Sequence, residues 1–481
     1  MLIRDPRATK LARVARGHVR LGSLSIPIWL ITALLFVAGV TIGLQFIASS
    51  YDVRGPIERI AKDFSGLPGS AETYFAALAI ALIGFTPRVR WISVGAMVVI
   101  QAGFVLGRWL RHDEFALGDG PLYVMIGLLA WSLFGLSGDA RARALKPLGV
   151  GLLLGFATKI ADSWLIVSTR ARPRVLDEYV MVADEALGQP SWRVGQVLDA
   201  LGPVPSAILH AVYIGLPLGA IAVALWQLRH VARGSSIWPS HHIIRSFLVV
   251  GMLGPLIYFL FPVVGPIFAY GDASHGYQIA DIWPGQLPLI PATPDWLDFD
   301  SATARNCMPS LHTAWATLIF IHTRRSPRPL RYAGTFWLVA TLLATLGFGY
   351  HYGVDLIAGA TLSLTIDSAL RDPRRGWGSW RIQLVGYGSA LFAALLLSYR
   401  YMPLQFAGHP WVFGPVLLAA LGLLIAMFYR EFFAGHRSEL ATGGIDAETT
   451  NPAPGPAPTP EQTPARGSSE PEDDLNLSSE R

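Results

Sequence analysis

The chain has little charge for its length. Asp, Glu, Lys and Arg make up only 15% of its 481 residues, whereas 52% are hydrophobic and the mean hydropathy is +0.42. A soluble domain carries charge on about a quarter of its residues. The composition therefore excludes an ordinary soluble protein and is typical of a polytopic membrane protein.

Cysteine is almost absent as well. The single cysteine, Cys307, excludes an intramolecular disulfide and leaves the redox compartment open. The net charge is only +5, and the arginines that produce it cluster between apolar segments. This pattern indicates membrane topology, because cytoplasmic loops collect Lys and Arg. No nucleic-acid partner is expected.

Twelve apolar segments predict an all-α fold, a polytopic membrane helix bundle of about 12 transmembrane helices. Each segment approaches the ~20 residues that cross a hydrocarbon core. The first follows a basic stretch and is longer than the apolar part of a signal peptide, so we expect a retained helix. The segments are 26–48, 72–86, 92–108, 121–137, 147–168, 203–228, 246–266, 308–323, 333–350, 353–370, 383–400 and 410–429.

The arginines also orient the predicted bundle. With the amino terminus inside, five short basic loops fall inside: 86–90, 141–146, 229–245, 324–331 and 371–381. The loop 267–304 instead carries several aspartates and almost no basic residue. Under the positive-inside rule, this loop, the start of 308–323 and the end of 333–350 lie on the extracytoplasmic face.

Two short motifs meet water at that face. The first, Arg305–His312, reads RNCMPSLH, and the second, His351–Asp355, reads HYGVD. Asp355 follows His351 by four residues, which places both on one helix face. The carboxylate can accept a hydrogen bond from one ring nitrogen and leave the other nitrogen free to attack phosphorus. A pair that only stabilises a helix end is the alternative, but ionisable residues at membrane depth favour function.

The first motif supplies a second histidine at a predicted helix start. Pro309 suits the first helical turn, and the free N–H groups there, with Ser310, could hold phosphate oxygens. His312 would then protonate a leaving oxygen as general acid. Arg305 and Asn306 could clamp the phosphate, although a role as interfacial anchor explains Arg305 equally well.

The segments Pro309–His312 and His351–Asp355 resemble the second and third signature motifs of the type 2 phosphatidic acid phosphatase superfamily. They are closest to the branch that holds inositol phosphorylceramide synthase and sphingomyelin synthase. The resemblance covers roughly 175–370 and implies a six-helix phosphatase-like catalytic core.

The resemblance also implies roles for three residues. His351 would be the nucleophile, Asp355 would position it, and His312 would act as general acid and base. The phosphohistidine so formed would be passed to water or to an acceptor hydroxyl. The chain departs from the phosphatase branches, since no lysine fits their Lys-x6-Arg-Pro motif and Ala344-Thr345 replaces their Ser-Arg. The synthase-like branch also lacks the first motif.

Together these features predict five parts. They are a basic cytoplasmic amino terminus (1–22), an accessory transmembrane region (23–170), the catalytic core (171–370), C-terminal transmembrane helices (371–434) and a disordered cytoplasmic tail (435–481). The tail is rich in Pro, Ala, Thr, Ser, Glu and Asp and cannot build a core.

The predicted function is an integral membrane lipid phosphotransferase that moves a phosphate-bearing head group, such as inositol phosphate, between lipids. It would act on the extracytoplasmic face of the plasma membrane, on a phospholipid donor and a lipid or alcohol acceptor, and a homo-oligomer is left open. A lipid phosphate phosphatase and a transporter are the alternatives. No cofactor or metal is expected. The His-His-Asp set could mimic a zinc site, but Asp355 is better placed as an orienter.

Three further features leave alternatives open. Lys159 and Asp162, at i, i+3 spacing in mid-span, could neutralise each other or line a separate cavity. His210, near Tyr213, favours an interhelical hydrogen bond. The segment 175–200 mixes apolar and acidic positions, and could lie on the membrane surface or cap the bundle.

Overall fold

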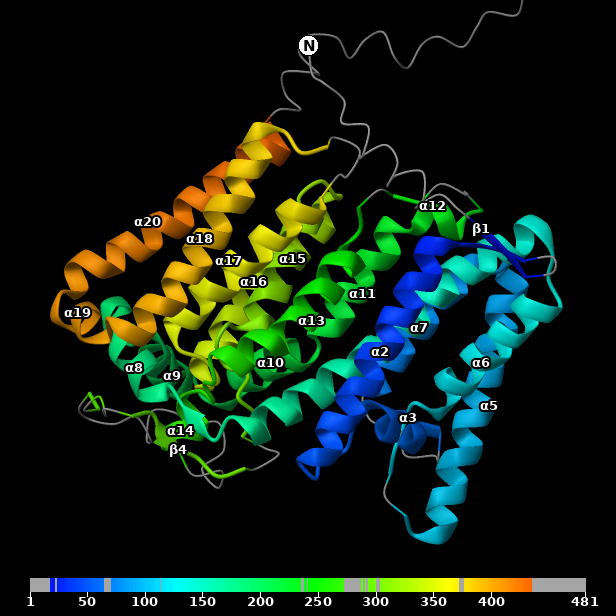
Figure 1. Cartoon of the computed structure of the whole chain (residues 1–481), viewed down its shortest axis with the longest axis horizontal. Helices are drawn as coiled ribbons and strands as arrows, with labels where there is room; N and C mark the ends of the chain where they lie inside the picture. Colours follow the sequence, from blue (N-terminus) through cyan, green and yellow to red (C-terminus); the bar gives the residue numbers. More distant parts are fainter. Residues whose placement is uncertain are drawn as a thin grey trace, which may run out of the picture. The chain divides into compact units, whose positions relative to one another are not determined.

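The computed structural model describes most of the chain as helix (Figure 1). Residues up to Glu431 form one unit, and the helices discussed below belong to it. The predicted cytoplasmic tail and nearly all of the predicted basic terminus lie outside the described residues. The structure describes residues 18–21, 24–64, 71–113, 115–234, 238–239, 241–271, 287–288, 290, 293–299, 303–371 and 376–434.

The amino-terminal part is a group of helices packed around a long one, α7. Gly151 of α7 lies so close to α4 that a Cβ there would collide with the carbonyl oxygen of Ala77, so glycine permits this approach. Lys159 of α7 also pairs with Asp63 of α3, Nζ to Oδ2, at 2.8 Å. These elements are α2 (Ile28–Ser50), α3 (Pro56–Phe64), α4 (Ala71–Ala81), η1 (Leu82–Gly84), α5 (Pro87–Arg111), α6 (Asp119–Phe134) and α7 (Gly138–Ala171).

The middle part surrounds α17, whose side chains are almost all buried. Helices α13, α15, α18 and α20 pack against it. Its elements are α8 (Asp177–Asp184), η2 (Glu185–Leu187), α9 (Pro190–Leu201), α10 (Pro203–Ile214), α11 (Leu216–Gln227), α12 (Arg229–Ala232), α13 (Ile243–Leu260), α14 (Pro266–Tyr270), α15 (Leu311–Thr323), α16 (Arg328–Gly347) and α17 (Gly353–Leu370). The last helices are α18 (Ser379–Tyr401), α19 (Pro403–Gly408) and α20 (Pro410–Tyr429).

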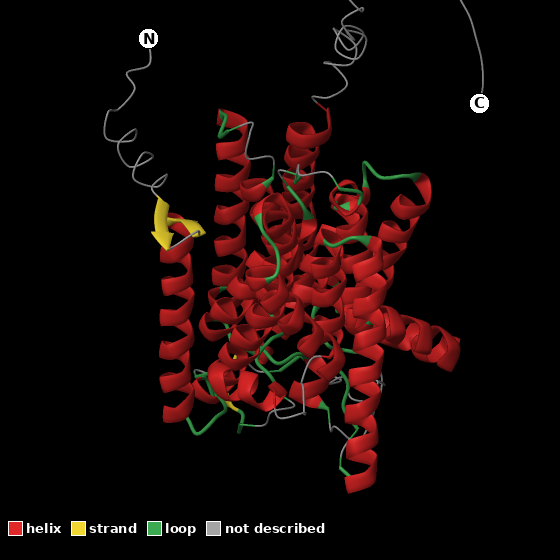
Figure 2. Ribbon diagram, turned by 90° about the vertical axis from the view of Figure 1, so that its right-hand side faces the viewer, coloured by secondary structure: helices red, strands yellow, loops and turns green. Residues whose placement is uncertain are grey.

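Strand is confined to two short antiparallel pairs among the described residues (Figure 2). β1 (His18–Leu21) pairs with β2 (Leu24–Pro27), and β3 (Arg174–Val175) pairs with β4 (Asp295–Trp296). The predicted helical class is therefore confirmed. The second pair joins the end of α7 to the segment before the first histidine motif.

Each of the twelve predicted segments coincides with a helix or, for 203–228, with the pair α10 and α11, which bend by 52°. Seven helices in the described residues are long and apolar enough to cross a membrane, or eight if the bent pair counts as one span. Helix α4 has 11 residues and α15 has 13, so at 1.5 Å per residue both fall short of a ~30 Å core. Twelve membrane spans and a six-helix core stay predictions.

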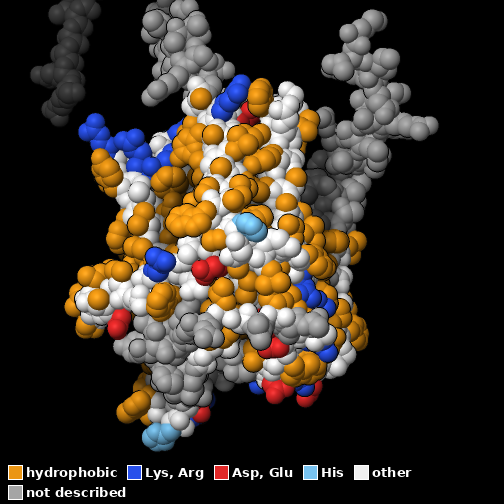
Figure 3. Space-filling model, turned by 90° about the vertical axis from the view of Figure 1, so that its left-hand side faces the viewer, with side chains coloured by type: hydrophobic (Ala, Val, Ile, Leu, Met, Phe, Trp, Pro, Cys, Tyr) orange, Lys and Arg blue, Asp and Glu red, His pale blue; other side chains and the backbone are white. Residues whose placement is uncertain are grey.

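The surface agrees with a membrane setting. Hydrophobic side chains predominate on the face formed by α18 to α20 (Figure 3), where Trp411 is 91% exposed. Such a large apolar side chain left outside the protein core indicates contact with lipid.

Helices α15 and α17 run in the same direction, and α16 returns between them. Near their starts, the Ser310 N–H donates to the carbonyl oxygen of Asp355 at 3.3 Å. Near their ends, His322 Nε2 lies 3.0 Å from Asp367 Oδ1. Because a helix rises 1.5 Å per residue, the two ends are separated by roughly 15–20 Å. Figure 1 shows α8, α9, α14 and β4 together at the end that holds the two histidine motifs.

Candidate active site

His351 lies in the short turn between α16 and α17, and the turn is fixed by its backbone. The His351 N–H donates to the carbonyl oxygen of Thr345 at 3.2 Å, and the Ile267 N–H donates to the carbonyl oxygen of Gly349 at 2.9 Å. The Ser191 hydroxyl donates to the carbonyl oxygen of His351 itself. The ring is thus carried by a turn that three other elements hold.

Asp355 stands behind the His351 ring. Its Oδ2 accepts the Tyr352 N–H at 2.9 Å and lies 3.4 Å from His351 Nδ1. A carboxylate at that nitrogen favours the tautomer with Nδ1–H, which leaves Nε2 unprotonated. Because His351 is only 4% exposed, burial lowers the pKa of His351 to about 3. Its imidazole is therefore neutral, the form in which it is a nucleophile.

Cys307 completes this group, and the sequence interpretation gave it no role. Its thiol donates to Asp355 Oδ2 at 2.5 Å, and its sulfur lies 3.4 Å from His351 Nδ1. Burial raises the pKa of Cys307 well above its ordinary value, so the thiol keeps its proton and remains a donor. Cys307, His351 and Asp355 are close enough to ligate one ion, but the protonated thiol and the occupied carboxylate favour a hydrogen-bonded group.

His312, the second residue of α15, faces the same space. Its ring lies 6.5 Å from the His351 ring, centroid to centroid. Tyr213 of α10 stacks on it at 4.0 Å, and the Tyr213 hydroxyl lies 3.1 Å from His312 Nδ1. The two histidines are therefore near enough to act on one phosphate ester. Sequence spacing could not reveal Tyr213 as the residue that orients His312.

Ser310 is a helix cap. Its Oγ accepts the Thr313 N–H at 3.2 Å, which satisfies one of the free donors at the start of α15. Its carbonyl oxygen lies so close to Gly359 of α17 that a Cβ at that position would collide with it. Ser310 thus ties α15 to α17, and it is not among the residues that line the cavity described below.

Arg305 and Asn306 are adjacent in the sequence but have different surroundings in the structure. The guanidinium of Arg305 is buried and donates to the carbonyl oxygens of Thr303 and Leu297, each at 2.7 Å. These acceptors make it an organiser of the loop before α15, and it is not among the residues that line the cavity described below. Asn306 instead lines the cavity that both histidines reach.

Two acidic residues of α8 accept hydrogen bonds from the backbone around the site. Asp177 accepts the N–H groups of Val264 and Gly265 at 3.0 and 2.8 Å and the Tyr352 hydroxyl at 3.0 Å. Burial raises the pKa of Asp177 to about 6, although these three hydrogen bonds lower it. Asp184 Oδ1 accepts the Val354 N–H, at the start of α17, at 2.9 Å.

These contacts bear on the first part of the segment 175–200. The apolar side chains of α8 are buried, as expected of a helix that caps the bundle. The signal was present in the sequence, since Asp177 and Asp184 are seven residues apart and share a helix face. Nothing in the sequence named the distant N–H groups that they accept.

A cavity of about 450 Å³ connects the site to the bundle interior. His312, His351, Tyr213 and Asn306 line one end of it, and side chains of α7 and α13 line the rest. Among its described lining residues there is no Lys or Arg. A phosphate bound there would be held by histidine, amide and free N–H groups.

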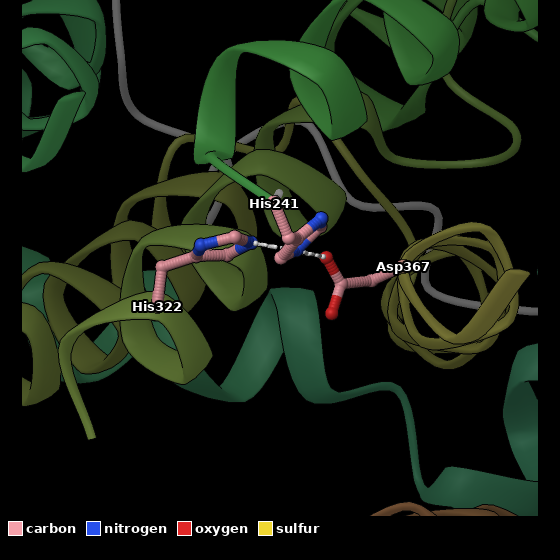
Figure 4. Close-up of side chains that lie close together, drawn as sticks. All are labelled: His241, His322 and Asp367. Carbon is pink, nitrogen blue, oxygen red and sulfur yellow. Dashed lines mark hydrogen bonds and ion pairs between the residues drawn. The ribbon is translucent and has the colours of Figure 1, made fainter. Parts of the chain in front are cut away.

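A second polar cluster lies at the opposite ends of α15 and α17 (Figure 4). His241 Nε2 and His322 Nε2 each lie 3.0 Å from Asp367 Oδ1 and 3.2 Å from each other. Arg371 Nε also pairs with Asp367 Oδ2 at 2.7 Å. The two histidines and the aspartate have the spacing of a metal site.

Gln227 decides how this cluster is protonated. Its Oε1 accepts the Ile243 N–H at 2.9 Å, so its amide group must face His322 Nδ1, which lies 2.9 Å away. His322 Nδ1 therefore accepts a hydrogen bond, and the proton of the neutral ring is on Nε2, directed at Asp367. A protonated Nε2 cannot ligate a metal, so the cluster is a hydrogen-bonded tie between α15 and α17.

Both histidine motifs lie in a part of the chain that matches a known family. Residues 178–367 match the family model of the PAP2 superfamily, and residues 28–167 match a domain of unknown function, DUF5933. No curated protein and no solved structure matches the chain. The chain thus carries a PAP2 superfamily domain, and it is a membrane phosphatase or phosphotransferase of the type 2 phosphatidic acid phosphatase kind.

Replacing Asp184 tests its positioning role. Asp184→Ala removes the acceptor of the Val354 N–H and should lower kcat at least tenfold, because the turn that carries His351 loses a support (about 1–3 kcal/mol for one unsatisfied buried group). Asp184→Asn keeps a carbonyl oxygen there and should retain most of the activity. Equal losses in both variants, measured by kcat and KM, would contradict a role through this hydrogen bond.

The assignment of the second cluster predicts how the protein responds to chelation. EDTA should leave the melting temperature within about 1 °C, because a hydrogen-bonded tie needs no ion. Asp367→Ala should lower stability by about 3–5 kcal/mol, since it removes the buried carboxylate that Arg371 and both histidines contact. A clear fall in melting temperature on chelation, reversed by added zinc, would show that the cluster binds metal.

Proposed function

We propose that the protein is a lipid phosphotransferase, which moves a phosphate-bearing head group between lipids through a phosphohistidine on His351. The observation that carries the proposal is the pair of histidines 6.5 Å apart at the end of an apolar cavity, with Asp355 behind only one of them. This asymmetry gives the two rings different tasks, since the carboxylate-oriented ring attacks while the other moves protons.

In the first step, His351 Nε2 attacks the phosphorus of the donor lipid. A nitrogen–phosphorus bond forms and the bond from phosphorus to the lipid oxygen breaks. The anionic phosphate of the bound donor favours the protonated form of His312, which gives its proton to that oxygen, so a neutral lipid alcohol leaves. Asp355 holds Nδ1–H and stabilises the positive charge that develops on the His351 ring.

In the second step, an acceptor hydroxyl reverses these changes. Neutral His312 takes the hydroxyl proton, the acceptor oxygen attacks phosphorus, and the nitrogen–phosphorus bond breaks. His351 returns to its neutral form and His312 to its protonated form. Water in place of the alcohol would make the same site a phosphatase, so the two reactions differ only in the acceptor.

Two features support transfer to a lipid alcohol. The cavity that leads to His312 and His351 is lined mostly by apolar side chains, which suits a hydrophobic acceptor. The positions at which the phosphatase branches carry Ser-Arg hold Ala344 and Thr345 here, and both side chains are buried. The expected cation is therefore missing from a plain phosphatase site.

The charge distribution supports an extracytoplasmic site. Arg324, Arg371 and Arg381 lie at the ends of helices next to the second cluster, away from His351. Because positive loops stay inside, we place the histidine end of α15 and α17 outside a plasma membrane. Transport is disfavoured, since His312 and His351 stand at helix starts and not in interrupted helices near the midplane.

Replacing His351 should abolish the reaction. His351→Asn removes the nucleophile and should lower turnover at least about 1,000-fold, while the exposed control His409→Asn keeps full activity. Products of purified protein would be separated after incubation with head-group-labelled phospholipids and candidate alcohols. A labelled acceptor establishes transfer and free phosphate establishes hydrolysis, whereas undiminished turnover by the variant would refute the mechanism.

The lowered pKa of His351 sets the pH dependence. Neutral imidazole is the attacking form, and a pKa of about 3 keeps the ring neutral well below pH 6.5. The pH profile of kcat/KM should therefore show no fall between about pH 7 and pH 5. If activity instead fell with a midpoint near the ordinary histidine pKa of about 6.5, the pKa of His351 in the free enzyme would not be lowered, which would contradict the prediction.

A further inference from the structure

One face of α7 is part of the reaction cavity. The residues that line it are Leu154, Ala157, Thr158, Ala161, Asp162 and Leu165. Their spacing follows the i, i+3, i+4, i+7 pattern of a single helix face. Helix α7 lies in the region matched by the domain of unknown function, outside the matched PAP2 domain. The site therefore takes a wall from each matched region.

The adjoining part of the wall belongs to α13, which packs beside α7 (Figure 1). Gly251, Met252 and Pro255 line the cavity from this side, and the Ser168 hydroxyl of α7 donates to the carbonyl oxygen of Pro255 at 3.4 Å. Both helices run toward the histidine end. Asp162 precedes Ser168 by six residues, so it lies about 9 Å further from that end.

The wall formed by α7 and α13 is apolar except at Thr158, Asp162 and Tyr258, and the Tyr258 hydroxyl donates to the carbonyl oxygen of Pro309 at 3.3 Å. Thr158 and Asp162 are one turn apart and both line the cavity. Lys159, between them, is directed at Asp63 of α3, 2.8 Å away, and is not among the lining residues. The sequence left open whether Asp162 lines a separate cavity; in the structure it lines the same cavity as the two histidines.

The side chains of Thr158 and Asp162 determine which group of a ligand can bind there. A carboxylate repels phosphate, so the phosphate belongs at the histidine end of the cavity. A carboxylate and a hydroxyl group in apolar surroundings bind a hydroxyl donor well, and a few placed polar groups are how such pockets gain specificity. Starting from the histidine end, the cavity would hold the phosphate ester, then the hydrocarbon chain, and then a hydroxyl group on that chain.

We propose that α7 makes the amino-terminal region part of the active site: its apolar face contacts the hydrocarbon part of the lipid substrate, and Asp162 with Thr158 binds a hydroxyl group on that lipid. The inference rests on the proposed function and adds a substrate class to it, hydroxyl-bearing long-chain lipids. It also gives the accessory helices a task, which is to hold α7 against α13.

The first test narrows the cavity beside α7. Ala161→Phe fills the cavity beside α7 and should lower kcat/KM at least tenfold for long-chain phosphatidic acid. The same variant should stay within twofold of the original protein for dibutyryl phosphatidic acid, whose chains do not reach α7. Leu153→Phe, on the outer face of α7, where Leu153 is 45% exposed, is the matched control and should change neither value.

The second test removes the charge. Asp162→Asn keeps the size of the side chain, and turnover would be compared on two phosphate lipids of equal chain length, one with a hydroxyl group along its hydrocarbon chain. The full-length protein should prefer the hydroxylated lipid, and the variant should lose that preference about tenfold or more. Normal activity on dibutyryl phosphatidic acid in each variant would show that the fold and the histidine site are intact.

The outcomes separate the two proposals. Activity on dibutyryl phosphatidic acid that is abolished by His351→Asn keeps the proposed function, whatever happens at α7. If Ala161→Phe then affects both chain lengths equally or neither, or if Asp162→Asn keeps the preference, the role of α7 is overturned. If the original protein processes no phosphate lipid, the proposed function fails and this inference fails with it.

Discussion

The buried carboxylate of Asp355 is the interaction on which the rest of the site depends. One oxygen, Oδ2, accepts the Tyr352 N–H and the Cys307 thiol and faces His351 Nδ1, while the residue's own carbonyl oxygen accepts the Ser310 N–H. A buried carboxylate is costly unless such donors surround it. Both histidine motifs therefore make polar contacts with this one residue.

Buried acids recur behind this centre. Asp177 and Asp184 accept backbone N–H groups from the segment before α14 and from the start of α17, where no helix partner exists for those donors. Together with Arg305, which satisfies carbonyl oxygens of the neighbouring loop, they replace regular secondary structure at the histidine end. This is how irregular backbone is stabilised next to a membrane, where unsatisfied polar groups are costly.

The sequence predicted the helices better than the contacts of the site. The lengths of the apolar runs located all twelve helical segments, because burial of a helix in lipid depends on its composition. The two histidine motifs were also predicted to meet. The roles of Cys307, Tyr213 and Asp177 were not predictable, since periodicity assigns a face to a residue but not the distant partner it touches. Lys159 shows the same limit: spacing places it near Asp162, but only the fold reveals its ion pair with Asp63.

The tie formed by His322 and Asp367 has a mechanical consequence. Helices α15 and α17 are joined at one end through Ser310 and Asp355 and at the other through this tie. Sliding one helix past the other would break polar contacts at both ends, so the pair behaves as a rigid frame that fixes the gap between the two histidines. Helix α13 belongs to this frame, because Ser246 bonds Asp367 and Tyr258 bonds the carbonyl oxygen of Pro309. Helix α7 is held against α13 by apolar packing and one long hydrogen bond, so motion of α7 is the easier way to admit a bulky lipid.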